Sequence, residues 1–264
     1  MKLLIRRLTI LSIAVAGWFP PAARALEIEV VKSVDAVTVR ILDWKKIVFA
    51  PILTNAGLVV VSPDGRTPVR YAEAKREAGT VTLSGGSAPG LSITETLRPI
   101  HAGLIERVVR VTATSDQRYY LELGWQAPGA GAFYSFMGKE TATKQFSLSC
   151  GGPEFAGHSQ ALQTFPLLGC LDNNQFYGLL GDSPGLWENR SFMRLDVEQR
   201  IFSLTTGDGS AKRIITIPRE LDATTVYRAR FDGWQHLEHG ESASFTTWLF
   251  ASPAHSQYDV QLAA

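Results

Sequence analysis

The sequence predicts an all-β protein, an antiparallel β-sandwich, and three observations lead to this prediction. Apolar residues recur at every second position in many short segments, which is the period of a strand with one buried face. Short stretches of Gly, Asn, Asp and Pro separate these segments and supply the residues that tight turns need. The 23 Gly and 13 Pro are scattered through 264 residues without a repeat, which suits a chain of many short strands.

Four segments show the alternation most clearly. They are residues 34–41 (VDAVTVRI), 80–85 (TVTLSG), 119–126 (YYLELGWQ) and 213–218 (RIITIP). In the third, the odd-numbered residues from Tyr119 to Trp125 share one face, and the even-numbered residues share the other. We expect this strand to belong to a sheet whose one face is buried against a core.

Turn signals separate the predicted strands. They occur at residues 62–65 (SPDG), 114–117 (TSDQ), 171–175 (LDNNQ) and 206–210 (TGDGS). Their Gly, Asn and Asp residues tolerate the backbone angles of tight reversals. Residues 68–78 (PVRYAEAKREA) fit either a short polar helix or a strand followed by a charged hairpin end. No linker divides the chain, so we expect one β-sandwich domain over residues 26–252.

The two ends of the chain have other predicted roles. Residues 1–25 have a basic start, an apolar run from Leu8 to Phe19, and small residues at Ala23 and Ala25. This pattern is typical of an export signal peptide. Since a membrane span needs about 20 apolar residues, we expect no span after signal cleavage and a periplasmic or secreted protein. Residues 253–264 are interpreted as a C-terminal tail or the start of a linker.

Charge and cysteine content exclude several classes of partner and cofactor. The formal net charge is +1, which gives no basic surface for a nucleic-acid backbone, so we expect no nucleic-acid partner. Cys150 and Cys170 lack a CxxC spacing, and we interpret them as a disulfide or as two buried thiols. The HLEH segment at 236–239 lacks the HExxH spacing of a zinc helix. We therefore expect neither a metal nor another cofactor.

Residues 129–166 are rich in Gly, Phe and Ser and alternate only weakly, so they are the first candidate to line a site. Sugars expose apolar CH faces that stack on aromatic rings, while amide, guanidinium and carboxylate groups bond their hydroxyls. This combination of side chains gives the candidate carbohydrate-binding residues, and we expect no catalytic residue among them: Trp125, Tyr134, Glu154, Trp187, Glu188, Asn189 and Arg190. For Trp44, Trp234 and Trp248 we expect core or edge packing.

Two long stretches resemble a known fold family. Residues 91–125 (LSITETLRPIHAGLIERVVRVTATSDQRYYLELGW) look like the sheet core of the galactose-mutarotase-like β-supersandwich. Residues 231–252 (FDGWQHLEHGESASFTTWLFAS) are similar to the closing strand pair of that fold. The resemblance implies the sandwich architecture, and its motifs are patterns of the fold rather than of a particular chemistry.

The family has two branches with different functions. One comprises mutarotases and aldose epimerases, which use a His acid and a Glu base. The chain departs from this branch, because it has no HxY histidine motif and no late Glu-Pro, and Ala113 stands where the family often has Asn. The other branch is a non-catalytic N-terminal domain that precedes a helical-toroid catalytic domain in exported bacterial glycoside hydrolases.

The resemblance therefore implies a carbohydrate-associated accessory or binding domain of an exported glycosidase, with a helical catalytic domain in cis or trans. Two alternatives stay open. One is an aldose 1-epimerase with an acid–base pair drawn from His101, His158, Glu154 and Glu188. The other is a structural, envelope-associated β-sandwich.

Overall fold

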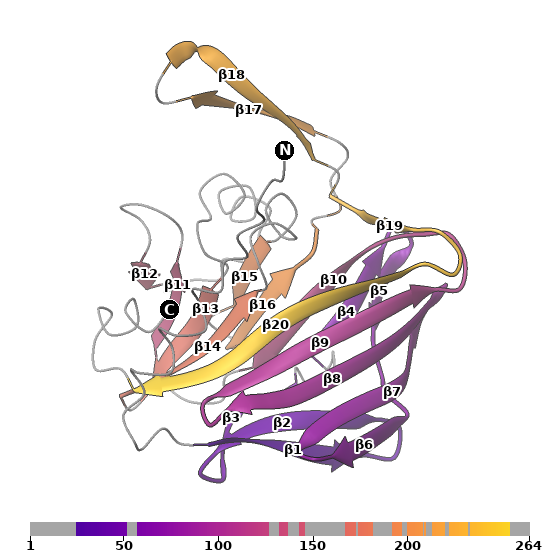
Figure 1. The fold of residues 1–264 in the computed structure, drawn as a ribbon, viewed down its shortest axis with the longest axis vertical. Helices are drawn as coiled ribbons and strands as arrows, with labels where there is room; N and C mark the ends of the chain where they lie inside the picture. Colours follow the sequence, from indigo (N-terminus) through magenta and orange to yellow (C-terminus); the bar gives the residue numbers. More distant parts are fainter. Residues whose placement is uncertain are drawn as a thin grey trace, which may run out of the picture.

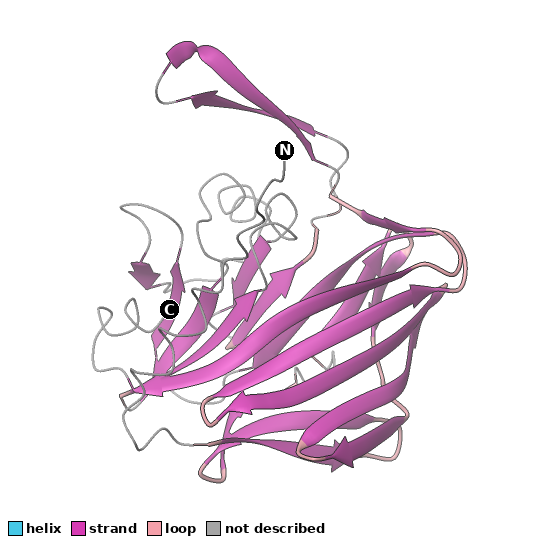
Figure 2. Cartoon of the chain, viewed as in Figure 1, coloured by secondary structure: helices cyan, strands magenta, loops and turns pink. Residues whose placement is uncertain are grey.

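The computed structural model describes residues 25–51, 57–126, 132–136, 143–145, 167–172, 174–181, 192–196, 200–207, 209, 213–219, 222–231 and 233–253. Within these ranges the regular structure consists of strands, and every pairing between strands is antiparallel (Figure 2). The predicted all-β, antiparallel fold class is confirmed. Among the described residues, no helix has the length and apolar character needed to cross a membrane.

Two large sheets form the main layers of the molecule (Figure 1). The nine-stranded sheet has, in spatial order, β12 (Thr143–Gln145), β11 (Ala132–Phe136), β13 (Leu167–Asp172), β14 (Gln175–Gly181), β20 (Ser242–Pro253), β9 (Leu104–Ala113), β8 (Leu91–His101), β7 (Thr80–Ala88) and β6 (Glu73–Glu77). The six-stranded sheet has β15 (Phe192–Asp196), β16 (Ile201–Thr205), β10 (Gln117–Gln126), β4 (Leu58–Ser62) and β5 (Gly65–Pro68), with β19 (Gln235–Leu237) paired to β10.

Two smaller sheets complete the described strands. The three-stranded sheet has β1 (Leu26–Lys32), β2 (Val37–Asp43) and β3 (Lys46–Phe49), and the two-stranded sheet has β17 (Arg213–Arg219) and β18 (Asp222–Phe231). The three-stranded sheet is tied to both large ones. Leu26 N donates to Ala102 O at 2.6 Å, beside β8 and β9, and Ala50 N donates to Gln126 O at 2.9 Å, at the end of β10.

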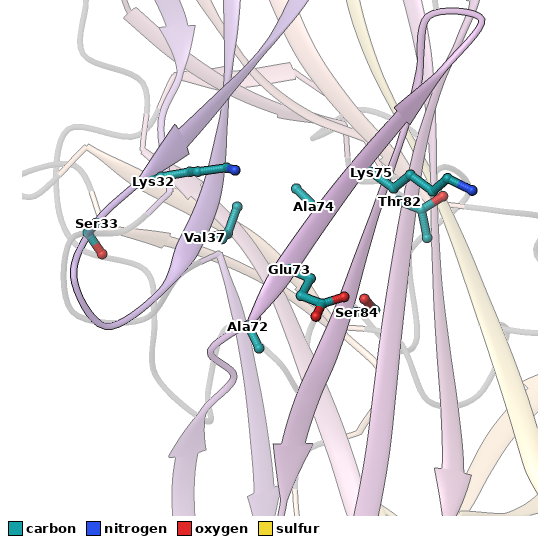
Figure 3. Close-up of a pocket in the computed structure, with 9 residues that line it drawn as sticks. All are labelled: Lys32, Ser33, Val37, Ala72, Glu73, Ala74, Lys75, Thr82 and Ser84. Atoms are coloured by element: carbon teal, nitrogen blue, oxygen red, sulfur yellow. The ribbon is translucent and has the colours of Figure 1, made fainter.

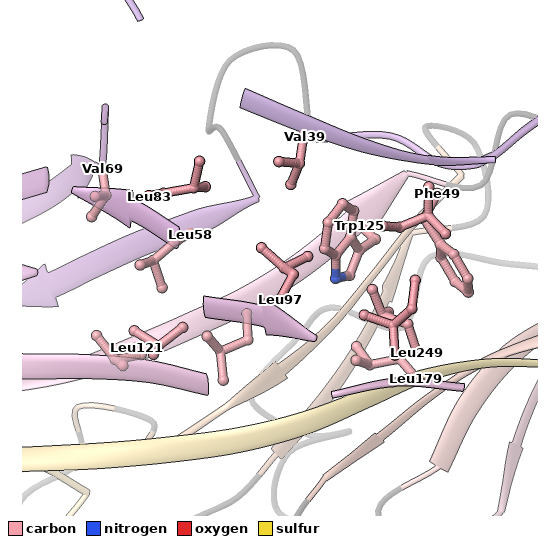
Figure 4. Close-up of a cluster of buried hydrophobic side chains, with 14 of the residues drawn as sticks. Val39, Phe49, Leu58, Val69, Leu83, Leu97, Leu121, Trp125, Leu179 and Leu249 are labelled. Atoms are coloured by element: carbon pink, nitrogen blue, oxygen red, sulfur yellow. The ribbon is translucent and has the colours of Figure 1, made fainter. Parts of the chain in front are cut away.

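The two large sheets and the three-stranded sheet share a large apolar cluster. Phe49 from β3, Leu121 and Trp125 from β10, Leu179 from β14 and Leu249 from β20 all belong to it and are almost completely buried (Figure 4). Burying each such side chain contributes about 1.5–3 kcal/mol relative to exposure. The alternation in β10 explains part of this arrangement, because it turns the odd-numbered side chains toward the core.

Strand β10 differs from the sequence prediction in one respect. Its core face is as expected, but its other face is covered too. Tyr120 packs against Trp234 with ring centroids 5.6 Å apart, and Glu122 accepts a 2.8 Å hydrogen bond from Arg66. The strand is therefore buried on both faces rather than half buried, because side chains from β5 and from the segment before β19 lie over the second face.

The predicted turns are confirmed where the structure describes them. Residues 62–65, 114–117 and 171–175 join β4 to β5, β9 to β10 and β13 to β14. Residues 206–210 lie only partly within the described ranges. Residues 68–78 form a strand with a charged hairpin end, β6, rather than a helix. Residues 34–41 become a strand only from Val37, because the segment before it turns between β1 and β2.

Candidate functional site

A cleft of about 570 Å³ opens between the β1–β2 hairpin and the outer edge of the nine-stranded sheet (Figure 3). Its polar lining comes from two places, the end of β1 and the β6–β7 pair. The lining residues are Lys32, Ser33, Val37, Ala72, Glu73, Ala74, Lys75, Thr82 and Ser84. A volume of this size falls within the range of small-ligand sites.

Strand register places the polar side chains of β6 and β7 on one surface. Glu73 is paired with Ser84, and Lys75 is paired with Thr82. Directly opposite residues in an antiparallel pair project to the same side of the sheet, and Figure 3 shows both pairs side by side. The alternate residue Leu83 points the other way and is buried in the core.

Two hydrogen bonds to backbone carbonyl oxygens hold the β1–β2 hairpin against this sheet edge. Arg76 of β6 donates a hydrogen bond to the carbonyl oxygen of Ile28 in β1. Val37 N donates to Tyr71 O at 2.9 Å. Both sides of the cleft are therefore fixed by hydrogen bonds between segments that lie far apart in the sequence.

The cleft offers groups suited to recognition of a polar ligand. Lys32 and Lys75 supply ammonium donors, although Lys75 Nζ also lies 2.6 Å from Glu77 Oε1. Glu73 supplies a carboxylate acceptor, and Thr82 and Ser84 supply hydroxyls that can donate or accept. Small apolar residues lie between them. No sequence motif indicates this set, although the four charged residues of β6 (EAKRE) are a usable signal for an exposed sheet edge.

A second polar cluster lies inside the sandwich. Arg107 of β9 donates from Nε to Glu95 Oε1 at 2.9 Å and from Nη2 to Glu95 Oε2 at 3.2 Å. Tyr71 donates its hydroxyl to Glu95 Oε2 at 2.8 Å, and Arg107 Nη2 also donates to Gly57 O at 3.2 Å. The guanidinium carbon lies 5.0 Å from the centre of the Trp125 ring, within the range of a cation–π contact.

This interior cluster is closed to solvent. Arg107 and Glu95 are 1% and 2% exposed. Burial raises the pKa of the Tyr71 hydroxyl well above its ordinary value, and the negative charge of Glu95 raises it further. Because Glu95 is fully engaged by Arg107 and Tyr71, its carboxylate is a structural partner of these groups rather than an accessible general base.

Trp125, the first of the predicted carbohydrate-binding residues, lies in this interior. It is 1% exposed, and its ring packs edge-on against Phe49 with centroids 6.1 Å apart. Since Arg107 occupies the neighbourhood of the ring, the indole has no face open to a sugar. Trp125 is therefore a core residue, contrary to the expectation, because strand alternation turns it inward with Leu121 and Leu123.

The other predicted site residues fall mostly outside the described ranges. Tyr134 lies in β11, where its backbone pairs with Gly169 of β13 and Gln145 of β12. Residues outside the described ranges are Glu154, Trp187, Glu188, Asn189 and Arg190. Their grouping as a carbohydrate site stays a prediction.

The structure describes only one of the two cysteines. Cys150 lies outside the described residues, and Cys170 is a free, buried thiol. Burial raises the pKa of Cys170 from 9.0 to about 11, although the nearby Arg200 guanidinium, which donates to Sγ at 3.3 Å, acts in the opposite direction. Of the two interpretations of the cysteines, a buried thiol describes Cys170.

Trp44 is the second residue whose expected place is wrong. We expected core or edge packing, but its side chain is 77% exposed in the turn between β2 and β3. Trp234 does pack at the sheet surface, against Tyr120. The reason for the error is that the sequence ILDWKKIVF lacks the Asn-Gly or Asp-Gly signature of a tight hairpin.

Of the four residues considered for an epimerase, the structure describes His101 alone. His101 is exposed at the end of β8, whereas His158, Glu154 and Glu188 lie outside the described ranges. His239 is held by the β9–β10 turn, where its Nδ1 lies 2.9 Å from Thr114 O. Among the residues that the structure describes, no group of three His, Cys, Asp or Glu side chains is arranged to hold a metal ion.

Several solved structures are similar to this chain. A kojibiose phosphorylase described as putative, from the human microbiome, matches with a TM-score of 0.42 and 11% identity over 90% of this chain and 28% of its own. A galactose mutarotase-like protein from Lactobacillus casei matches with a TM-score of 0.44 and 6% identity over 85% and 100%. Heparan sulfate lyase HepC from Pedobacter heparinus matches with a TM-score of 0.40 and 9% identity over 84% and 31%.

The chain thus spans 28% of the phosphorylase and 31% of the lyase, but the full length of the mutarotase-like protein. One of these neighbours, the Lactobacillus casei protein, is described as galactose mutarotase-like, the fold that residues 91–125 and 231–252 resemble. No protein-family model matches the chain, and no curated protein matches it.

Proposed function

We propose that the chain is a carbohydrate-associated accessory domain of an exported glycosidase, acting in the periplasm or after secretion. In this proposal it binds a glycan and is non-catalytic by itself. A helical catalytic domain in cis or trans performs the bond cleavage. The domain's contribution is positional, since it holds the glycan next to a separate active site.

The observation that supports the proposal is the composition of the cleft. It combines hydroxyl, ammonium and carboxylate groups with small apolar residues, a set that can bond the hydroxyls of a saccharide while contacting its CH groups. Its walls are fixed by Arg76 and Val37, which hydrogen-bond across the two sides. A fixed, open cleft with polar groups set in a partly apolar lining is suited to holding a ligand in place.

Charges on β6 have a second role, because charged side chains on an edge strand oppose pairing with another chain. The experiment must therefore measure binding and not only stability. Glu73 and Ser84 face each other across the β6–β7 pair, so we expect the double substitution Glu73→Ala, Ser84→Ala to remove two adjacent hydrogen-bonding groups. Thr94→Ala, an exposed change on β8 outside the cleft lining, is the matched control.

The full chain is screened against an array of neutral and acidic oligosaccharides, and the strongest ligand is titrated by calorimetry. Loss of two net hydrogen bonds predicts a dissociation constant about tenfold higher or more for the double variant, with Thr94→Ala unchanged. Failure of every glycan to bind wild-type protein would refute the proposal. Glycan binding that is unaffected by the double substitution would show that the cleft is not the binding site.

A further inference from the structure

The outer face of the nine-stranded sheet carries a row of side chains that starts at the cleft. In strand register, Lys75 of β6 pairs with Thr82 of β7, and Thr82 pairs with Thr96 of β8. Thr96 pairs with Val108 of β9, which pairs with Thr246 of β20. Directly paired residues project to the same side of a sheet, so these five residues form one cross-strand row. Its strands lie side by side in one layer (Figure 1).

The cross-strand row faces away from the core. The residues that follow its members in β7, β8, β9 and β20 are buried on the opposite face: Leu83, Leu97, Val109 and Thr247. The row members of the same four strands are half-buried. Within the described part of the chain, the hydroxyls of Thr82, Thr96 and Thr246 have no hydrogen-bond partner. These hydroxyls can therefore donate to a ligand and accept from it.

Trp248 stands beside the far end of the cross-strand row. It lies two residues after Thr246 on the same face of β20, and it pairs with Glu106 of β9. Its side chain is half-buried. To the other described residues it makes no ring contact, hydrogen bond or ion pair. An indole in this position presents apolar ring surface next to hydroxyl groups, which suits contact with the CH groups of a sugar.

The charges on this face of the sheet balance. The outer sides of β6, β8 and β9 carry three cations and three anions: Lys75, Arg98, Arg110, Glu73, Glu77 and Glu106. Lys75 Nζ lies 2.6 Å from Glu77 Oε1, and Arg98 Nη2 lies 2.8 Å from Glu106 Oε2. Because the face has no excess of either sign, it favours a neutral ligand over a charged one.

The length of the cross-strand row sets the size of the ligand. Neighbouring strands lie about 4.8 Å apart, so the four steps from Lys75 to Thr246 cover about 19 Å. One sugar ring cannot contact both ends of such a row. A straight oligosaccharide of several linked rings can.

We propose that the cleft and the cross-strand row form one extended site for a neutral, straight-chain oligosaccharide. The chain runs from the cleft across β7, β8 and β9, where the row hydroxyls bond its hydroxyls, and its far end stacks on Trp248. This inference rests on the proposed carbohydrate-associated function, which it deepens by naming the class and the length of the ligand.

Threonine also suits a strand for purely structural reasons, because its β-branched side chain packs well on a pleated surface. The test must therefore measure how binding depends on ligand length. The probes are the disaccharide and the hexasaccharide of three neutral β-1,4-linked series, built from glucose, xylose and mannose, together with a galacturonate hexamer. Calorimetric titration of the full chain gives each dissociation constant.

Two substitutions remove parts of the extended site without touching the cleft lining. Trp248→Leu keeps apolar cover on the sheet but removes the flat ring, and Trp248→Phe restores a ring. Thr96→Val removes one hydroxyl and keeps the shape of the side chain. Thr94→Val is the matched control, because Thr94 lies on the same strand and face but pairs with Arg110 outside the cross-strand row. Melting temperatures of all four variants check that each is folded.

Wild-type protein should bind the hexasaccharide of at least one neutral series about tenfold more tightly than the disaccharide. Trp248→Leu should lose most of this advantage, Trp248→Phe should keep most of it, and neither should change disaccharide binding. Thr96→Val should weaken hexasaccharide binding about threefold or more, with Thr94→Val unchanged. Equal affinity for the two lengths in every series would overturn the inference, as would a length advantage that Trp248→Leu retains.

The extended site and the proposed function fail in different ways. Disaccharide binding that is lost in Glu73→Ala, Ser84→Ala, combined with no advantage for any hexasaccharide, would overturn the extended site and leave the cleft as a carbohydrate site. Tighter binding of the galacturonate hexamer than of every neutral hexasaccharide would overturn the neutral ligand class alone. Absence of binding to these probes and to the wider array would overturn both proposals.

Discussion

Trp125 and Trp44 occupy opposite environments in this fold, although both follow runs of alternating apolar residues. Trp125 is 1% exposed and packs against Phe49 and the Arg107 guanidinium. Trp44 is 77% exposed at the tip of a hairpin. The difference shows that turn geometry, and not polar or irregular sequence beside it, decides which aromatic residue is exposed here.

The same contrast holds for charged groups. Glu95 and Arg107 are buried inside the sandwich and form a bidentate ion pair. Glu73, Lys75 and Lys32 line an open cleft at a sheet edge. Interior charge in this protein is paired within the packed strands, whereas the charge at the edge is exposed to solvent, with Lys75 Nζ 2.6 Å from Glu77 Oε1.

The largest expected effect comes from exchanging the two tryptophans for alanine one at a time. Trp125→Ala should lower the free energy of unfolding by about 3–5 kcal/mol, because it leaves a cavity in the core and removes the ring beside Arg107. Trp44→Ala should change it by less than about 0.5 kcal/mol, as for an exposed substitution. Denaturant unfolding of both variants measures the contrast, and equal destabilisation would break it.

Removing Glu95 should have the next largest effect. Glu95→Ala leaves the Arg107 charge buried without its carboxylate, which should cost about 3 kcal/mol of unfolding free energy. The double variant Glu95→Leu, Arg107→Met removes both charges and should recover most of this loss. If the double variant is no more stable than Glu95→Ala in the same denaturation assay, the interior pair acts through more than mutual neutralisation.

Alkaline pH should remove the stability that the buried Cys170 thiol contributes to the fold. Cys170 has a pKa raised from 9.0 to about 11 by burial, so the unfolded chain loses this proton at lower pH than the folded chain does. Its contribution to stability is present below pH 9 and is lost as the pH rises toward about 11. Unfolding free energies of wild type and Cys170→Ala, compared between pH 8 and pH 11, should converge or cross in this window, and parallel curves would contradict the assignment.

Much of the fold follows from local sequence patterns. Alternation in residues 119–126 correctly gives the core face of β10, and the Asp and Asn residues at 171–175 correctly mark the β13–β14 turn. The cover on the second face of β10 comes from Arg66 and Trp234, which lie far away in the chain. No local pattern can indicate such cover.

The candidate sites were less accessible to sequence analysis for the same physical reason. The cleft is lined by residues that are distant in the sequence, such as Lys32, Lys75 and Thr82. Tertiary contacts bring them together, including the Arg76 hydrogen bond to the Ile28 carbonyl oxygen. The sequence does not indicate that Trp44 is exposed, because Trp-Lys is not a pair that a tight turn normally uses. The position of Trp125 before an irregular segment suggests a carbohydrate-binding residue, whereas its place in the strand alternation puts it in the core.

One measurement tests most directly whether this chain binds carbohydrate without transforming it. Nuclear magnetic resonance spectra of the full chain with free aldoses and reducing neutral oligosaccharides report saturation transfer to the sugar and exchange between its anomers in the same sample. We predict saturation transfer to the neutral oligosaccharides, with anomer exchange no faster than in buffer. Accelerated exchange that depends on protein concentration would contradict this account and identify the chain as an epimerase.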